Sequence, residues 1–219
     1  MQSRIDWQSI STVLLDMDGT LLDLRFDTWF WTELVPERYG ERNGLDREEV
    51  LERLSPEFES RRGTLEWYCL DFWARHLELD LQGLKHNAAD EIRFLPGVTR
   101  FLTRLRSMQK RRVLVTNAHS GILNLKLACT GLASYFDAIY SSHEFGVPKE
   151  APEFWARLQE VETFDKASSL FVDDSLPVLE SARNFGIRHV MGITKPDSAK
   201  PAGQLDGFDT VEGIVELID

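Results

Sequence analysis

The sequence is organised around eight residues, Val13-Leu14-Leu15-Asp16-Met17-Asp18-Gly19-Thr20. The apolar residues at its start are typical of the end of a buried strand. Alternate residues of an extended chain point to the same face, so Asp16 and Asp18 are expected to lie side by side, and Gly19 allows a sharp turn after them. Two carboxylates this close have raised pKa values unless a cation lies between them. Mg2+, a hard ion that prefers oxygen ligands, suits that position.

The length and charge of the chain limit what it can bind. A chain of 219 residues can bury one substantial core, with room for a small second domain. The net charge of −11 argues against nucleic acids and anionic membrane surfaces as partners, because both attract clustered Lys and Arg. An anionic substrate would therefore need a local cation, which again favours a metal site.

We expect a reducing, cytoplasmic location. The first ten residues are mixed and polar, unlike a leader, and no apolar run reaches the length that spans a bilayer. Cys69 and Cys129 are too few and too isolated for a disulfide framework or a zinc site, so both are expected to be buried. His119 is expected near the active site, while metal-ligand spacing is lacking at His76, His86, His143 and His189.

Residues 23–93 differ in character from the rest of the chain. They contain 17 acidic and 10 basic residues and no convincing strand. Aromatic residues recur there, many at helical spacing: Phe26, Trp29, Phe30, Trp31, Trp67, Tyr68, Phe72 and Trp73. We predict an all-helical insertion, with breaks at Asn43-Gly44 and Ser55-Pro56. Most of its aromatics are expected to pack the core of the insertion, leaving one or two to stack on a planar base.

From residue 95 onward, apolar strands alternate with helices. Strands are predicted at 112–117, 138–142, 169–174 and 189–194, and helices at 98–108, 120–130, 151–161, 175–186 and 211–218. Single helices between strands imply a parallel sheet with helices on both faces, so the fold class is α/β. We assign residues 1–22 and 94–219 to the core domain and residues 23–93 to a helical cap.

Polar residues follow three of the predicted strands, at the edge where parallel sheets bind ligands. They are Asp16 and Asp18, Thr116 and Asn117, and Asp173 and Asp174. The four aspartates together would form an oxygen-lined site for Mg2+. That cation would offset the repulsion between a carboxylate nucleophile and a phosphoryl oxygen.

These residue types favour phosphoryl transfer. Asp16 can attack phosphorus and form an aspartyl-phosphate, while Asp18 can protonate the leaving alkoxide and later deprotonate water. The Thr116 hydroxyl and the N–H groups that follow it, beginning at Asn117, can bind the phosphoryl group. Lys149 precedes a predicted helix and can supply fixed positive charge to the transition state.

The chain resembles the haloacid dehalogenase-like hydrolase superfamily over essentially its whole length. Asp16-Met17-Asp18-Gly19-Thr20 is similar to the first motif of that superfamily, Thr116 to the second, Lys149 to the third and Asp173-Asp174 to the fourth. The resemblance implies a Rossmann-like core, a helical cap inserted after the first motif and Mg2+-dependent phosphoryl transfer. It implies that Asp16 is the nucleophile, Asp18 the acid and base, and Thr116 and Lys149 the phosphate ligands.

The metal ligands implied by the resemblance are Asp16, the backbone carbonyl of Asp18, and Asp174, with Asp173 as a further candidate. The chain departs from some members of the superfamily at Val178, where they carry a second acid. We expect the adjacent pair Asp173-Asp174 to replace that acid.

Several strings are similar to the bacterial GMP/IMP nucleotidases of this superfamily. They are residues 14–24, Phe26-Asp27, Phe30-Trp31, Asn43-Gly44, residues 67–71, residues 116–119 and Phe145-Gly146. This resemblance implies a 5′-nucleotidase that hydrolyses purine nucleoside monophosphates, GMP and IMP.

Three alternative functions share parts of this pattern. A phosphosugar phosphatase or phosphomutase would use every core residue named above. A carbon–halogen hydrolase would use the same nucleophile but needs neither Mg2+ nor a leaving-group acid, which Asp18 and the Asp173-Asp174 pair count against. A non-catalytic binding protein would have no need of all these acids.

Overall fold

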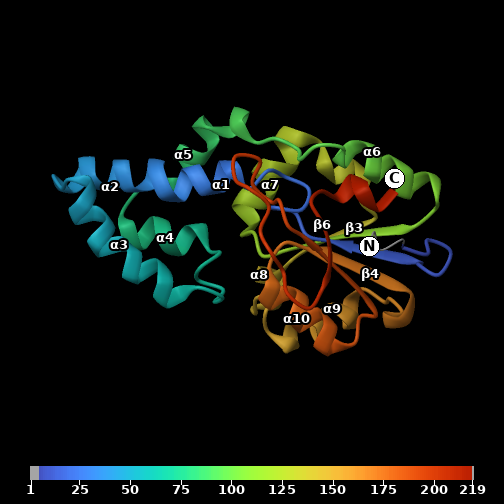
Figure 1. The fold of residues 1–219 in the computed structure, drawn as a ribbon. Coiled ribbons are helices and arrows are strands. Elements are labelled where there is room, and N and C mark those ends of the chain that lie inside the picture. The colour runs from blue at the N-terminus through green and yellow to red at the C-terminus, as the bar shows by residue number, and fades with distance from the viewer. Residues whose placement is uncertain (1–4, 219) are drawn as a thin grey trace.

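The computed structural model describes residues 5–218. Six parallel strands form one sheet in the order β3-β2-β1-β4-β5-β6 (Figure 1). Their bounds are β1 Thr12–Leu15, β2 Arg111–Thr116, β3 Ala138–Ser141, β4 Ser169–Asp173, β5 His189–Ile193 and β6 Asp209–Val211. The α/β class and the parallel sheet predicted from the sequence are confirmed, and β6 is a strand that the sequence pattern did not reveal.

The first strand lies inside the sheet because it is apolar on both faces. Val13, Leu14 and Leu15 are fully buried. β1 pairs with β2 on one side and with β4 on the other, which places Leu15 opposite Leu114 and Val172. The order of strands reverses at β1, so its carboxyl end lies at the switch point where open α/β sheets bind ligands.

Helices cover both faces of the sheet (Figure 1). Val13 and Leu15 share one hydrophobic cluster with apolar side chains of the helices α6 Val98–Ser107, α7 Ser120–Thr130 and η5 Ile214–Ile218. Leu14 belongs to the cluster of the opposite face, with side chains of α9 Pro152–Val161 and α10 Leu176–Phe185. Adjacent residues of β1 therefore pack against the helices on opposite faces of the sheet, because successive side chains of a strand point to opposite faces.

Two helix ends lie where the sequence predicts them. α7 ends at Gly131 and α10 at Gly186, and both glycines have the positive φ that terminates a helix, 67° and 104°. The short helices of the core are η3 Leu132–Tyr135, α8 Ser142–Phe145 and η4 Lys166–Ser168. Within residues 5–218, no helix is long and apolar enough to cross a bilayer.

The segment between β1 and α6 is helical and has a core of its own (Figure 1). It contains α1 Arg25–Trp29, the π-helical η1 Phe30–Leu34, α2 Val35–Asn43, α3 Arg47–Arg61, α4 Leu70–Leu77, α5 Leu81–Asn87 and η2 Ala89–Glu91. Trp73 is buried among aromatic rings, with ring centroids 4.8 Å from Phe58 and 6.1 Å from Trp31. Ile122 of α7 joins the same cluster, so the cap packs on the core domain at that helix.

One predicted break in the cap is wrong. α3 continues through Pro56 to Arg61. The helix begins with a capping box, in which the Asp46 carboxylate accepts from the Glu49 N–H (3.0 Å) and the Glu49 carboxylate accepts from the Asp46 N–H (2.9 Å). Pro56 and Glu52 are exposed, so water can reach the carbonyl group that loses its helical partner to the proline.

The helix predicted over residues 211–218 is confirmed only in part, because it is a 3-10 helix that begins at Ile214. β6 occupies residues 209–211 and pairs with β5, while a 3-10 helix, η5, covers Ile214–Ile218. β6 is only three residues long and two of them are exposed, so it lacks the apolar pattern that identifies a strand in sequence.

Candidate active site

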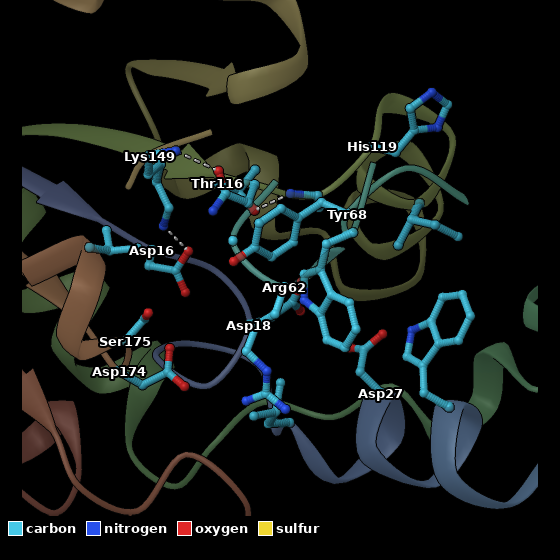
Figure 2. A pocket seen from close by; sticks show the side chains of 18 of the residues that line it. Asp16, Asp18, Asp27, Arg62, Tyr68, Thr116, His119, Lys149, Asp174 and Ser175 are labelled. Carbon is cyan, nitrogen blue, oxygen red and sulfur yellow. Dashed lines mark hydrogen bonds and ion pairs between the residues drawn. The ribbon is translucent and has the colours of Figure 1, made fainter. Parts of the chain in front are cut away.

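Three strand ends meet at one edge of the sheet. Asp16 follows β1, Thr116 ends β2 and Asp173 ends β4, and all three residues are at most 5% exposed. Figure 2 shows the side chains of Asp16, Lys149 and Asp174 gathered on one side of a common space. Polar groups buried this deeply require partners, and those partners define the site.

Lys149 is the partner of two of these carboxylates. Its Nζ donates to Asp16 Oδ1 (2.5 Å), to Asp173 Oδ2 (2.7 Å) and to the Val115 carbonyl (3.1 Å). Its backbone N–H donates to Asn117 Oδ1 (2.9 Å), which fixes the loop that carries it. Burial lowers the pKa of Lys149, but Asp16 and Asp173 outweigh burial and raise it, so the ammonium group stays charged.

Asp16, Asp173 and Asp174 form a group that fits a metal ion. One carboxylate oxygen of each lies within 4.8 Å of the others. Burial raises the pKa of Asp16 to about 6, and burial together with the charges of Asp173 and Asp16 raises the pKa of Asp174 well above its usual range. A divalent cation would relieve this repulsion, and a set of carboxylate oxygens suits Mg2+.

The loop after β1 brings Gly19 against Asp174. The φ of Gly19 is +86°, and a Cβ atom at this position would lie 2.5 Å from Asp174 Oδ2 and 2.9 Å from Pro196 Cβ. Glycine alone tolerates both this backbone angle and this contact. Gly19 therefore leaves room for the Asp174 carboxylate, in addition to allowing the turn.

The side chain of Asp18 lies outside this carboxylate group. Its Oδ1 accepts from Lys126 Nζ (2.6 Å), which also donates to Asp27 Oδ2 (2.6 Å). Asp27 Oδ1 accepts in turn from Lys85 Nζ (2.6 Å). A chain of alternating charges therefore links Asp18 to cap helices α1 and α5 through Lys126 of α7. A metal contact from Asp18 would use its backbone carbonyl, as the resemblance implies.

These neighbours set the pKa of Asp18. Burial raises it to about 6, Lys126 opposes that rise and Asp27 adds to it. Burial also acts on Asp27, but Lys126 and Lys85 outweigh it and hold the pKa of Asp27 below its usual value. A carboxyl group with a pKa near 6 can both donate and accept a proton close to neutral pH.

The sequence pattern does not reveal three members of the site, Lys85, Lys126 and Asp27. The signal in the sequence is Lys126, a lysine within the mostly apolar stretch 120–130, and the structure shows that it is only 1% exposed. A lysine is almost never buried without a charged partner, so its presence there predicts one. The identity of that partner depends on the contact between α7 and α1, which no local pattern reveals.

Thr116 and Asn117 are buried, and both make structural hydrogen bonds. Thr116 Oγ1 accepts from the Ala118 N–H (3.0 Å). Asn117 Nδ2 donates to Glu150 Oε2 (3.0 Å), and Glu150 Oε1 accepts from the hydroxyl of Tyr68 in the cap (2.5 Å). The cap and the core domain are thus connected beside the strand ends, and contacts from Thr116 and Asn117 to a substrate stay predictions.

Residues 10–186 match the model of the haloacid dehalogenase-like hydrolases. The chain belongs to this family. The GMP/IMP nucleotidases YrfG of Escherichia coli (strain K12) and Shigella flexneri are each 42% identical to it over 198 residues, which cover 90% of this chain and 89% of theirs. An HAD phosphatase structure from Thermococcus onnurineus has a TM-score of 0.79 and 23% identity, covering 95% of this chain and 96% of that one. The similarity to the Thermococcus onnurineus structure concerns the fold alone.

In this family member, a cavity of about 520 Å³ joins the strand ends to the cap. Its polar end is formed by Asp16, Asp18, Lys149 and Asp174. The cap side of the cavity is aromatic and is lined by Trp31, Phe58, Trp67 and Trp73, while Tyr68 lies nearer the strand ends, beside Thr116 (Figure 2). His119 also lines the cavity, as the sequence predicts, although Figure 2 shows its ring turned away from the carboxylates.

Proposed function

We propose that this protein is a Mg2+-dependent phosphatase that hydrolyses purine nucleoside 5′-monophosphates, GMP and IMP above all. The observation that carries the proposal is a single cavity with a carboxylate and lysine end and an aromatic end. The similarity to GMP/IMP nucleotidases over 90% of the chain supports the choice of substrate. In this proposal residues 23–93 are the cap, and residues 1–22 and 94–219 are the catalytic core.

Asp16 is the nucleophile in this proposal. Its carboxylate attacks phosphorus, the bond to the leaving oxygen breaks and an aspartyl-phosphate forms. Lys149, 2.5 Å from Asp16 Oδ1, orients the nucleophile and offers positive charge to the phosphoryl oxygens, alongside Thr116 and Asn117. Asp16, Asp173, Asp174 and the Asp18 carbonyl would hold Mg2+, which compensates the negative charge of nucleophile and phosphate.

Asp18 acts as the general acid and base. It gives its proton to the departing nucleoside oxygen, and the resulting carboxylate then takes a proton from the water that attacks the aspartyl-phosphate. Lys126, 2.6 Å away, stabilises the carboxylate between these two steps. A pKa of about 6 leaves both protonation states accessible near neutral pH.

The aromatic end of the cavity takes the purine ring. A planar base stacks on indole and phenyl rings with a gain of about 1–3 kcal/mol. The cap also covers the strand ends and reduces the access of water to the aspartyl-phosphate, as lids do in other enzymes.

The test is the release of phosphate from a panel of substrates, with Mg2+ and with a chelator. The panel contains GMP, IMP, AMP, pyrimidine nucleotides, sugar phosphates and a haloacid. We expect metal-dependent release that is selective for GMP and IMP. Faster release from sugar phosphates would contradict the nucleotide assignment, and chloride release from the haloacid would contradict phosphatase activity as the main function.

A further inference from the structure

Three potential metal ligands outside the carboxylate group meet where the cap contacts the core domain. Cys69 precedes α4 of the cap, His119 precedes α7 and His143 lies in α8. One ligand atom of each residue lies within 4.8 Å of the other two. The sequence shows no such cluster, because these residues are far apart in the chain. Cys69 is also only partly buried, and Cys129 is exposed, contrary to expectation.

The two histidine rings each present one nitrogen without a partner. Nδ1 of His119 and Nε2 of His143 are buried and have no hydrogen-bond partner among residues 5–218. The other ring nitrogens have polar neighbours, since the Asn117 backbone faces His143 and Asp71 Oδ2 lies 3.8 Å from His119 Nε2. A carbonyl or carboxylate beside the far nitrogen is the usual arrangement of a metal-binding histidine, because it leaves the near nitrogen with a lone pair.

The ring geometry agrees with a shared ion. The centroids of His119 and His143 are 5.0 Å apart and the rings are nearly perpendicular, at 85°. A metal ion binds a neutral imidazole through the ring nitrogen that carries no proton.

Cys69 supplies a soft ligand at the same place. It is the N-cap residue of α4, and its Sγ accepts from the Phe72 N–H (3.4 Å). The sulfur atom therefore lies at the cap–core contact, and a metal ion binds a cysteine through this atom as the thiolate. Thiolate and imidazole ligands favour Zn2+ and related transition-metal ions over Mg2+.

We propose that Cys69, His119 and His143 form a second metal site, which binds a Zn2+-class ion and ties the cap to the core domain. A tetrahedral Zn2+ ion would separate these ligand atoms by about 3.4–3.6 Å, so small side-chain rotations complete the site. Three protein ligands leave the fourth position to water. The site does not depend on the proposed function, because its ligands differ from the four aspartates.

Cobalt absorption tests the ligand set directly. The full-length protein is titrated with Co2+ in excess Mg2+, which occupies the carboxylate site. We expect visible bands of a four-coordinate ion and a near-ultraviolet sulfur-to-cobalt band, and loss of the latter in Cys69→Ser. Serine is a good N-cap, so this variant keeps α4 intact. Cys129→Ser is the matched control and should retain the band.

Two outcomes of this titration would overturn the proposal. One is a wild-type protein that shows no sulfur-to-cobalt band, and the other is a band that persists in Cys69→Ser.

The histidine ligands are tested by the Zn2+ affinity, measured in competition with a coloured chelator. We expect at least about 100-fold weaker binding in Cys69→Ser and in His143→Gln, and no change in His86→Gln. Equal affinity in all four proteins would also overturn the proposal.

Hydrogen exchange tests the connection between the cap and the core domain. Zn2+ should slow the exchange of backbone amides around Cys69 and around His119 together in the wild-type protein, and in Cys129→Ser. The same amides should show no Zn2+ effect in Cys69→Ser. Slower exchange around His119 alone would contradict an ion that bridges the two domains.

Discussion

Asp16 is buried with its carboxylate against Lys149, and this position determines what its replacement should do. Asn at this position keeps the shape of the side chain but cannot attack phosphorus. We expect Asp16→Asn to lower kcat for GMP by at least about a thousandfold. The melting temperature should stay close to that of the wild-type protein, because burial already disfavours the charged form of Asp16. Phosphate release and circular dichroism measure the two effects, and retained turnover would contradict the role of Asp16 as nucleophile.

Lys126 and Asp27 should shift the pH dependence of the reaction in opposite directions. The acid form of Asp18 is needed to protonate a poor leaving group, so kcat/KM for GMP falls as the pH rises through its pKa. Lys126 lowers that pKa and Asp27 raises it. We therefore expect the falling limb of the pH profile to move to higher pH in Lys126→Met, by at least about one unit, and to lower pH in Asp27→Asn.

The same measurement on a nitrophenyl phosphate serves as the control. Its leaving group departs without protonation, so neither variant should move a falling limb for this ester. Shifts in the same direction for both variants, or equal shifts for both substrates, would contradict the assignment of Asp18 as the acid.

At the scale of a loop, Gly19→Ala should weaken metal binding. The added Cβ would lie 2.5 Å from Asp174 Oδ2, so this carboxylate has to move away from Asp16 and Asp173. Gly131→Ala is the matched control, because Gly131 also has a positive φ, +67°, but no atom lies near its Cβ position. Both variants should lose about 1 kcal/mol of unfolding free energy from backbone strain, and Gly19→Ala should lose more, because its added Cβ also lies 2.9 Å from Pro196 Cβ. A weaker apparent affinity for Mg2+ is expected only in Gly19→Ala, and equal affinity in both would contradict this account of Gly19.

Local signals explain which elements the sequence predicted. α7 and α10 end at glycines that follow the last apolar residues of each helix pattern, and the strands β1, β2 and β4 carry continuous apolar runs before their polar ends. α3 continues through Pro56, because its capping box and the buried Leu54 stabilise the helix before the proline and Phe58, which packs against Trp73, stabilises it after the proline. The chain from Lys85 to Asp18 and the Cys69 cluster arise from contacts between the cap and the core domain. Such contacts leave no periodic trace in the sequence.

At the scale of the whole molecule, the cap should decide which phosphate ester is hydrolysed. Trp67 lines the aromatic end of the cavity. We expect Trp67→Ala to lower kcat/KM for GMP by about tenfold or more, the value of one stacking contact, with little change for ribose 5-phosphate. Trp29→Ala is the control, because Trp29 is 38% exposed and does not line the cavity. An equal loss for both substrates would indicate that Trp67 serves the fold rather than the base.

The most direct test of the account is to trap the phosphoryl group on the protein. GMP labelled with radioactive phosphorus is mixed with excess enzyme and Mg2+, quenched in acid within one turnover, and the protein is digested for peptide mapping. We predict transient label on the peptide that contains Asp16 and none in Asp16→Asn. Phosphate release from GMP without label on that peptide at any time, or with label on another residue, would contradict the account.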